Sequence, residues 1–266
     1  MQHMVRLTSR LATSLAVSLL ALTLAACSDS DDKAEAPAAA PTETAAPAVP
    51  AADVAAAPAT DTAAATSPET TGATPAAVEA PKPDGDVDMA KVLEPGPLKE
   101  MAIGKEDAPV TIVEYMSMTC PHCARFHEGT FHALVDKYVD TGKVRFILRE
   151  FPFDPRAAAA IMLARCAPES QYFPMVDVLF KQQQTWATAE DARTALLQIA
   201  RLAGFTQESF EACLTNQKLL DDVNAVRTKG AEQFGVNSTP TFLINGKRYS
   251  GEMSIEKMSA IIDPLL

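Results

Sequence analysis

The sequence is poor in aromatic residues, and it lacks an uncharged apolar run long enough to cross a membrane. Aromatic residues make up 6% of its 266 residues, with a single tryptophan. The longest such run, residues 11–26, has about 16 residues, whereas a transmembrane helix needs about 20. Basic residues are also scarce, because 23 Lys and Arg stand against 34 Asp and Glu. The sequence therefore carries no basic patch that would indicate a nucleic-acid partner.

The N-terminal residues have the pattern of a bacterial secretory signal. Arg6 and Arg10 precede the apolar run, which ends in Leu-Ala-Ala-Cys. This ending resembles the lipoprotein cleavage box and implies cleavage before Cys27 and lipidation of that cysteine, with ordinary signal cleavage as the alternative. We therefore expect residues 1–26 to be a lipoprotein signal peptide. The mature protein is then an anchored lipoprotein of the bacterial periplasm, a compartment in which disulfides persist.

Residues 27–91 are of low complexity, and Ala, Pro, Thr, Glu and Asp dominate them. The stretch contains no aromatic residue, and residues 28–91 hold 12 acidic against 3 basic side chains. Such a composition cannot bury enough apolar area to offset the entropy of ordering the chain. We expect a disordered acidic tether here, or alternatively a partner-binding tail, followed by the folded domain at residues 92–266.

The folded part shows strand and helix patterns that predict an α/β fold with an inserted helical subdomain. A lead-in at 102–109 is rich in turn residues. The hydrophobic spacing then predicts, in order, a strand at 110–117, a helix at 124–139, a strand at 143–151, a helical insert at about 156–234, strands at 241–244 and 247–250 around an Asn-Gly turn, and a final helix at 254–262. About 175 residues suffice for one core with a subdomain.

Two cysteines, Cys120 and Cys123, lie two residues apart between the first predicted strand and helix. Pro121 fits the first helical position, which places Cys120 at the N-cap, where unpaired amides stabilise a thiolate and lower the thiol pKa. Cys123 lies one turn further in and is more shielded. His122 can donate to the thiolate or pair with its charge. A zinc half-site or a purely structural disulfide is the alternative interpretation.

The pattern resembles the DsbA-like thioredoxin family over about residues 103–262. The resemblance rests on Cys-Pro-His-Cys at 120–123, the strand at 146–152, the helical insert, and the segment 235–246 with its Thr-Pro. It implies a thioredoxin fold and a thiol:disulfide oxidoreductase that donates its disulfide to reduced secreted proteins. It also implies a DsbB-type, quinone-linked membrane oxidase as the reoxidising partner. We expect a monomer that needs no cofactor and no metal.

The resemblance assigns roles to residues outside the cysteine motif. Thr239 and Pro240 would form a cis-proline dipeptide that faces the motif, with Thr239 backbone groups pairing with the substrate. An ordinary trans turn is the alternative. Glu114 would be a buried acid that helps to move the proton of the inner cysteine, unless it lies at a strand edge facing water.

Four further residues have less specific patterns. His127 and His132 follow the motif on the predicted helix, and we expect them at the surface rather than as copper or zinc ligands. Cys166 and Cys213 resemble positions that pair in some relatives, and are otherwise buried thiols.

Other functions remain compatible with the sequence. A disulfide isomerase or reductase fits Thr239, because the best-known oxidases of the family have Val before this proline. Such proteins usually carry a dimerising N-terminal domain, whose place the tether takes here. A copper- or zinc-binding envelope protein using Cys120, His122 and Cys123 is a second alternative, and a tethered structural lipoprotein without activity is a third.

Overall fold

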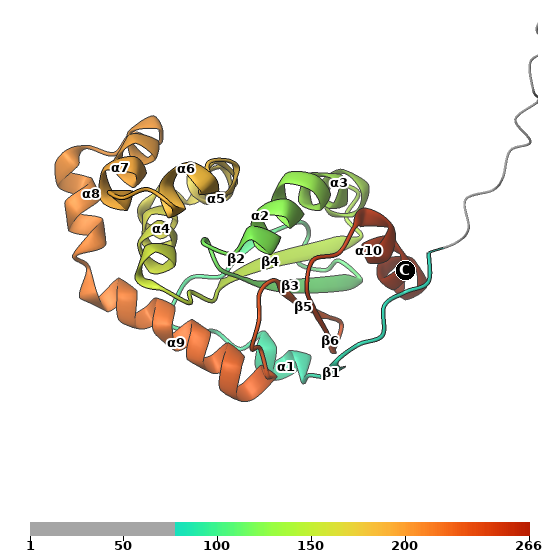
Figure 1. The fold of residues 1–266 in the computed structure, drawn as a ribbon. Helices are drawn as coiled ribbons and strands as arrows, with labels where there is room; N and C mark the ends of the chain where they lie inside the picture. The colour runs from blue at the N-terminus through green and yellow to red at the C-terminus, as the bar shows by residue number, and fades with distance from the viewer. Residues whose placement is uncertain (1–77) are drawn as a thin grey trace, which may run out of the picture. The chain divides into compact units, whose positions relative to one another are not determined.

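The structure is a computed structural model, and it describes residues 78–266 (Figure 1). The predicted signal peptide, Cys27 and most of the predicted tether lie outside the described residues. Within residues 78–266, no helix combines the length and the apolar character needed to span a bilayer.

Six strands form one mixed sheet in the order β1-β6-β5-β3-β4-β2. The neighbours β3 and β4 are parallel, and every other pair is antiparallel. The strands are β1 (Gly85–Asp86), β2 (Met101–Ile103), β3 (Val110–Met116), β4 (Val144–Glu150), β5 (Thr241–Ile244) and β6 (Lys247–Ser250). The predicted strands and the hairpin turn are therefore confirmed.

Strand β3 lies in the middle of the sheet, where it is hydrogen-bonded to β4 on one side and to β5 on the other. Val113 lies opposite Ile147 of β4 and opposite Leu243 of β5, and all three side chains are fully buried. A strand covered on both faces needs a near-continuous apolar sequence, which Val-Thr-Ile-Val-Glu-Tyr-Met supplies with two exceptions, the partly buried Thr111 and the buried Glu114. The helical crossover between the parallel strands β3 and β4 begins directly after β3, at the two cysteines.

Helices cover both faces of the sheet (Figure 1). One face carries α2, the turns that continue it, and α10, while the other carries α1 and the long helix α9, and the two faces belong to separate apolar clusters. The elements on these faces are α1 (Met89–Val92), α2 (Pro121–Arg125), the π-helical η1 (Phe126–Phe131), α3 (His132–Leu134), the π-helical η2 (Val135–Val139), α9 (Gln217–Phe234), α10 (Ile255–Ile262) and the 3-10 turn η4 (Asp263–Leu265).

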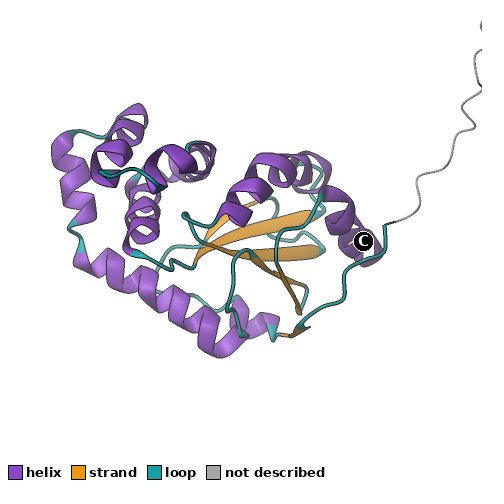
Figure 2. Cartoon of the chain, viewed as in Figure 1, coloured by secondary structure: helices purple, strands orange, loops and turns teal. Residues whose placement is uncertain are grey.

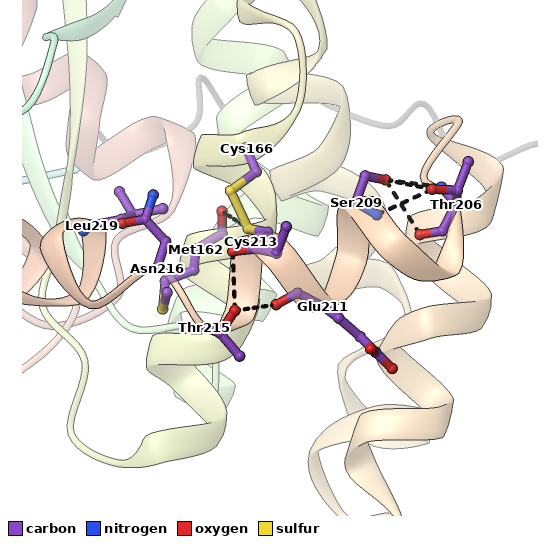
Figure 3. Close-up of a disulfide and its surroundings, with 10 residues drawn as sticks. Met162, Cys166, Thr206, Ser209, Glu211, Cys213, Thr215, Asn216 and Leu219 are labelled. Carbon is purple, nitrogen blue, oxygen red and sulfur yellow. Dashed lines mark hydrogen bonds between the residues drawn. A yellow bond between two sulfur atoms is a disulfide. The ribbon is translucent and has the colours of Figure 1, made fainter. Parts of the chain in front are cut away.

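The predicted insert is a group of helices at one end of the sheet, with α9 returning along the sheet (Figure 2). Its remaining elements are α4 (Pro155–Cys166), the 3-10 turn η3 (Glu169–Gln171), α5 (Tyr172–Lys181), α6 (Gln183–Ala187), α7 (Ala192–Leu202) and α8 (Gln207–Leu214). A disulfide between Cys166 and Cys213 joins the C-terminal end of α4 to α8 (Figure 3). A capping box of Thr206 and Ser209 begins α8.

Two expectations about the start of the domain are wrong. Strand β2 lies partly within the stretch expected to be a turn-rich lead-in, and it pairs with β4. Strand β1 lies before residue 92, the expected boundary, and pairs with β6. Asp84 extends this pairing, because its backbone N–H donates to the Arg248 carbonyl at 2.7 Å and its carboxylate accepts from the Ser250 N–H at 2.7 Å. Backbone pairing of this kind needs no apolar side chains, so the composition does not reveal it.

Helix α9 lies close against β3 at one glycine. A Cβ atom at position 230 would lie 2.6 Å from Cε1 of the fully buried Tyr115 ring. Gly230 therefore allows the helix to approach the strand, and it accounts for a residue with low helix propensity inside an 18-residue helix.

We predict that Gly230→Ala lowers the free energy of unfolding by about 1–3 kcal/mol, because an added methyl group overpacks a rigid aromatic contact. The matched control is Gly129→Ala, at a helical position where a Cβ would meet no atom within 4 Å. This control should stabilise the protein by up to about 1 kcal/mol through helix propensity. Urea unfolding of the two variants measures both changes, and equal changes would contradict the close-packing explanation.

Candidate active site

The first cysteine sits at the N-terminus of a helix, as the proline spacing predicts. Pro121 occupies the first turn of α2, and Cys120 is the N-cap residue, with extended backbone angles of φ −78° and ψ 119°. The Cys120 side chain makes no capping hydrogen bond of the usual kind. Its sulfur is therefore free to face the amides of the first turn and the loop opposite.

The surroundings of Cys120 lower the pKa of its thiol to about 5 from an ordinary value of 9.0. The largest cause is a hydrogen bond with the Cys123 side chain, and partial burial opposes it. The Thr239 side chain and the backbone amides of Cys123 and His122 add smaller contributions that stabilise the thiolate. In its neutral form the thiol donates to the Thr239 carbonyl across a sulfur–oxygen distance of 3.1 Å. Cys120 is thus a stabilised thiolate at neutral pH.

The second cysteine has the opposite properties. Cys123 is fully buried, and this burial is the main reason that its thiol pKa is raised well above the ordinary value. Its hydrogen bond with Cys120 and the negative charge of Glu114 raise the pKa further. One sulfur is therefore accessible and anionic, while its neighbour is shielded and protonated, and both are free thiols here.

The segment with Thr239 and Pro240 faces the cysteines, and the peptide bond between these residues is cis. Thr239 is nearly buried, and its carbonyl is the acceptor for the Cys120 thiol. Immediately after Pro240, β5 pairs with β3, the strand that leads into the cysteine motif. The sheet therefore brings together two segments that are about 120 residues apart in the sequence.

The expected contact of the His122 ring with the thiolate is wrong. Its Nδ1 accepts a hydrogen bond from Nη2 of Arg125 at 2.6 Å and lies 3.3 Å from Oε2 of Glu252. Arg125 is one turn further along the helix, and the ring pairs with this side chain instead of the sulfur. His122 acts on the sulfur through its backbone amide instead.

Glu114 is buried beneath the motif rather than facing water, and it contacts a residue that the sequence analysis placed at the surface. His127 is only 2% exposed, and its Nε2 lies 2.9 Å from Oε2 of Glu114. The expected surface position holds for His132, whose side chain is half exposed. His127 lies four residues after Cys123 and four before Phe131, so the helical spacing of buried residues was the signal that could have placed it inside.

The helical insert also contacts the cysteine loop directly. The side-chain amide of Gln183 on α6 donates to the carbonyls of Met118 and Cys120, at 2.8 and 2.9 Å. The hydroxyl of Thr119 donates to Asp154, the N-cap residue of α4, at 2.5 Å. No sequence motif marks Gln183, because its role depends on how the insert packs against the sheet.

No metal-binding cluster is evident in the described part of the chain. Among residues 78–266, no group of three or more His, Cys, Asp or Glu side chains is arranged to hold an ion.

Comparison with known proteins places this chain in a family. A sequence model described as thioredoxin matches residues 98–264. A Rickettsia bellii protein named as a protein-disulfide oxidoreductase is 36% identical over 168 residues, which cover 62% of this chain and 63% of that protein. The match thus spans less than two thirds of the length of the Rickettsia protein.

Solved structures give the same assignment. The crystal structure of alpha-DsbA1 from Wolbachia pipientis is 30% identical, with a TM-score of 0.61, covering 66% of this chain and 94% of that one. BdbD from Bacillus subtilis, at 18% identity and a TM-score of 0.57, shares the fold and covers 68% of this chain and 96% of that one. The chain belongs to the thioredoxin family. Within that family it is a DsbA-like protein, with the helical insert of this group.

We predict that the thiolate absorbance of the reduced protein develops with a midpoint near pH 5 and is lost in Cys120→Ser. The folded pKa lies below the ordinary value, so the thiolate contributes its full stabilisation of the reduced protein above about pH 9. That contribution is lost as the pH falls through about 5. A pH titration of absorbance checks the midpoint, and a midpoint near that of free cysteine would refute the proposed environment.

We further predict that Gln183→Met lowers the free energy of unfolding by about 1–3 kcal/mol, because two carbonyls near the active site lose their donor. The neighbouring Gln184 is exposed, and Gln184→Met is the matched control that should change stability by less than about 0.5 kcal/mol. Chemical denaturation measures both, and a Gln183 variant as stable as its control would show that the two hydrogen bonds contribute nothing net.

Proposed function

We propose that this protein is a thiol:disulfide oxidoreductase that donates its Cys120–Cys123 disulfide to reduced secreted proteins in the bacterial cell envelope. The observation that carries the proposal is the contrast between the two sulfurs. Cys120 is accessible with a thiol pKa of about 5, whereas Cys123 is buried with a raised pKa. A pair of this kind has one sulfur for the substrate and one that closes the disulfide.

The reaction proceeds by two thiol–disulfide exchanges. A substrate thiolate attacks Sγ of Cys120 in the oxidised protein, the bond to Cys123 breaks, and Cys123 leaves with the electron pair and takes up a proton. A second substrate thiolate then attacks the substrate sulfur of the mixed disulfide. Cys120 leaves as a thiolate, and its low pKa makes it a good leaving group. The products are a substrate disulfide and two reduced protein thiols.

The same contrast favours donation of the disulfide to a reduced substrate over reduction of a substrate disulfide. Stabilising the Cys120 thiolate stabilises the reduced protein relative to the oxidised one. A disulfide whose reduced form is stabilised has a higher, more oxidising reduction potential. The low pKa of Cys120 therefore supports an oxidant.

The surface around Cys120 suits an extended polypeptide. One shallow hollow lies beside Thr119 and Pro121 and reaches Asp154 and Gln184. A second hollow is lined by residues that include His122, Arg125, Thr239 and Glu252. In this proposal the backbone of Thr239, next to cis Pro240, pairs with the substrate segment that carries the attacking cysteine.

The cellular setting is part of the proposal and rests on the sequence patterns. Cleavage before Cys27 and lipidation of that residue would anchor the protein to a bilayer of the periplasm through the acidic segment that follows. A DsbB-type, quinone-linked membrane oxidase would restore the disulfide after each cycle, and the protein would act as a monomer.

A disulfide isomerase or reductase is the second candidate, and Thr239 before the cis proline is the residue that favours it. The reduction potential separates the two functions, because thioredoxin, a reductase, has a potential of about −270 mV and DsbA one of about −120 mV. Equilibration with glutathione buffers measures this value. A potential close to that of thioredoxin would replace the oxidant in this proposal by a reductase.

We predict that the oxidised protein forms a disulfide in a reduced two-cysteine peptide and that Cys120→Ser abolishes this activity. Reduced Cys123→Ser should instead attack the disulfide form of this peptide through its Cys120 thiolate and stay linked to it as a mixed disulfide, with the other peptide sulfur leaving as a thiolate, since the buried thiol that would release the peptide is removed. The measurement is mass spectrometry of peptide and protein after mixing. Peptide oxidation by Cys120→Ser at the wild-type rate would overturn the proposed function.

A further inference from the structure

We propose that His127 is the positioning residue that holds the Glu114 carboxylate while Glu114 exchanges a proton with Cys123. The inference rests on the proposed function, because it concerns the breaking and formation of the Cys120–Cys123 disulfide. Its structural basis is a buried polar pair, Glu114 and His127, whose carboxylate charge acts on the shielded Cys123.

The two members of the pair come from different elements and are both inaccessible. Glu114 projects from β3 and is fully buried, and His127 lies on η1 and is 2% exposed. The distance from Nε2 of His127 to Oε2 of Glu114 is 2.9 Å, a well-formed hydrogen bond. A carboxylate in the apolar core is costly unless it is paired in this way.

Aromatic rings fix the orientation of the His127 imidazole. The ring stacks on Phe180 at a centroid distance of 4.6 Å and packs against Phe131 at 4.8 Å, with the edge of Phe126 at 5.5 Å. These contacts leave the ring little freedom to turn away. The imidazole therefore holds one oxygen of Glu114 at a constant place in the core.

The other carboxylate oxygen is the one available for chemistry. Oε1 of Glu114 is buried and has no hydrogen-bond partner among the described residues. A buried acceptor without a partner has a high free energy unless a proton reaches it. The charge of Glu114 acts on Cys123, which is also fully buried, so the carboxylate and the thiol share one desolvated site.

The charged groups around this site leave Cys123 as the proton-exchange partner. The charge of Glu114 also raises the pKa of Tyr172 on α5, but the Tyr172 hydroxyl donates to Glu150 at 3.0 Å. Glu150 is in turn paired with Arg165 at 2.5 Å. Tyr172, Glu150 and Arg165 are thus paired with one another. The Cys123 sulfur, by contrast, gains a negative charge when the disulfide is broken.

The proton and electrons balance within this set of residues. When a thiolate attacks Sγ of Cys120, the sulfur–sulfur bond breaks and its electron pair goes to Cys123. Glu114, protonated at Oε1, gives its proton to the Cys123 sulfur and becomes a carboxylate. The N–H at Nε2 of His127 then donates to Oε2 and stabilises that carboxylate, and the proton returns to Glu114 when the disulfide reforms.

The test is the single-turnover rate at which the oxidised full-length protein reacts with excess dithiothreitol at neutral pH. His127→Phe keeps an aromatic ring but removes the hydrogen bond, and we expect a rate loss of about tenfold or more. His127→Gln supplies an amide donor and should stay within about threefold of wild type. The matched control is His132→Phe, an exposed histidine on the same helical segment, which should leave the rate unchanged.

A double-mutant cycle separates positioning from a merely structural role. Glu114→Gln should slow the reaction about as much as His127→Phe, and the double variant should be no slower than the slower single variant, because both remove one function. Alkylation of Cys120 should keep its midpoint near pH 5 in every variant, since the pair lies beneath Cys123. The proposal would be overturned if the rate loss of the double variant equalled the product of the two single losses. A wild-type rate in a folded His127→Phe variant would overturn it as well.

A measurement on the wild-type protein covers the case in which His127→Phe does not fold. Nitrogen NMR of the reduced protein should show Nε2 of His127 carrying the proton, and the signal should shift in Glu114→Gln. A bare Nε2 in the reduced protein would refute the inference. The dithiothreitol reaction requires no protein substrate. If the protein reacted with dithiothreitol as expected but oxidised no peptide, the proposed function would be wrong while the role of His127 would stand.

Discussion

The single constraint on which the site depends is that two sulfurs, one helical turn apart, must have opposite environments. The N-terminus of α2 provides this difference, because the N-cap residue Cys120 is close to water and to the free amides, while Cys123, the third residue of the helix, is inside the core. Pro121 fixes where the helix begins, and the buried strand β3 fixes where that beginning lies. A helix that started one residue earlier or later would exchange these environments or remove the contrast.

The rest of the domain holds this arrangement in place from several directions. Strand β5 brings the Thr239 carbonyl to the exposed sulfur, and Gln183 of the insert donates to the carbonyls on either side of Thr119. The insert is itself tied together by the disulfide between Cys166 and Cys213 and is joined to the sheet through the pair of Glu150 and Arg165. The helical insert is therefore part of the active-site support as well as a cover for the sheet.

The sequence predicted those parts of the fold and site that depend on local patterns. Apolar runs located β3, β4 and β5, Asn245-Gly246 located the hairpin, and the proline between the cysteines located the start of α2. What it missed depends on tertiary contacts. The burial of His127 needs Glu114 as a partner across the core. The His122 ring contacts both Arg125 and Glu252, and Glu252, which is 130 residues away, also pairs with Arg125. Strand β1 escaped prediction because its backbone pairing is independent of side-chain character.

Strand β1 also affects whether other polypeptides can add to the edge of the sheet. Both outer positions of the sheet are taken by very short strands, β1 with two residues and β2 with three. A long bare edge would act as a template on which another chain could add strands and aggregate. Under the proposed function the substrates are unfolded polypeptides, the kind of chain that could add to such an edge. By pairing β6 with a two-residue piece of its own N-terminal segment, the domain leaves only very short strands at the edges of its sheet.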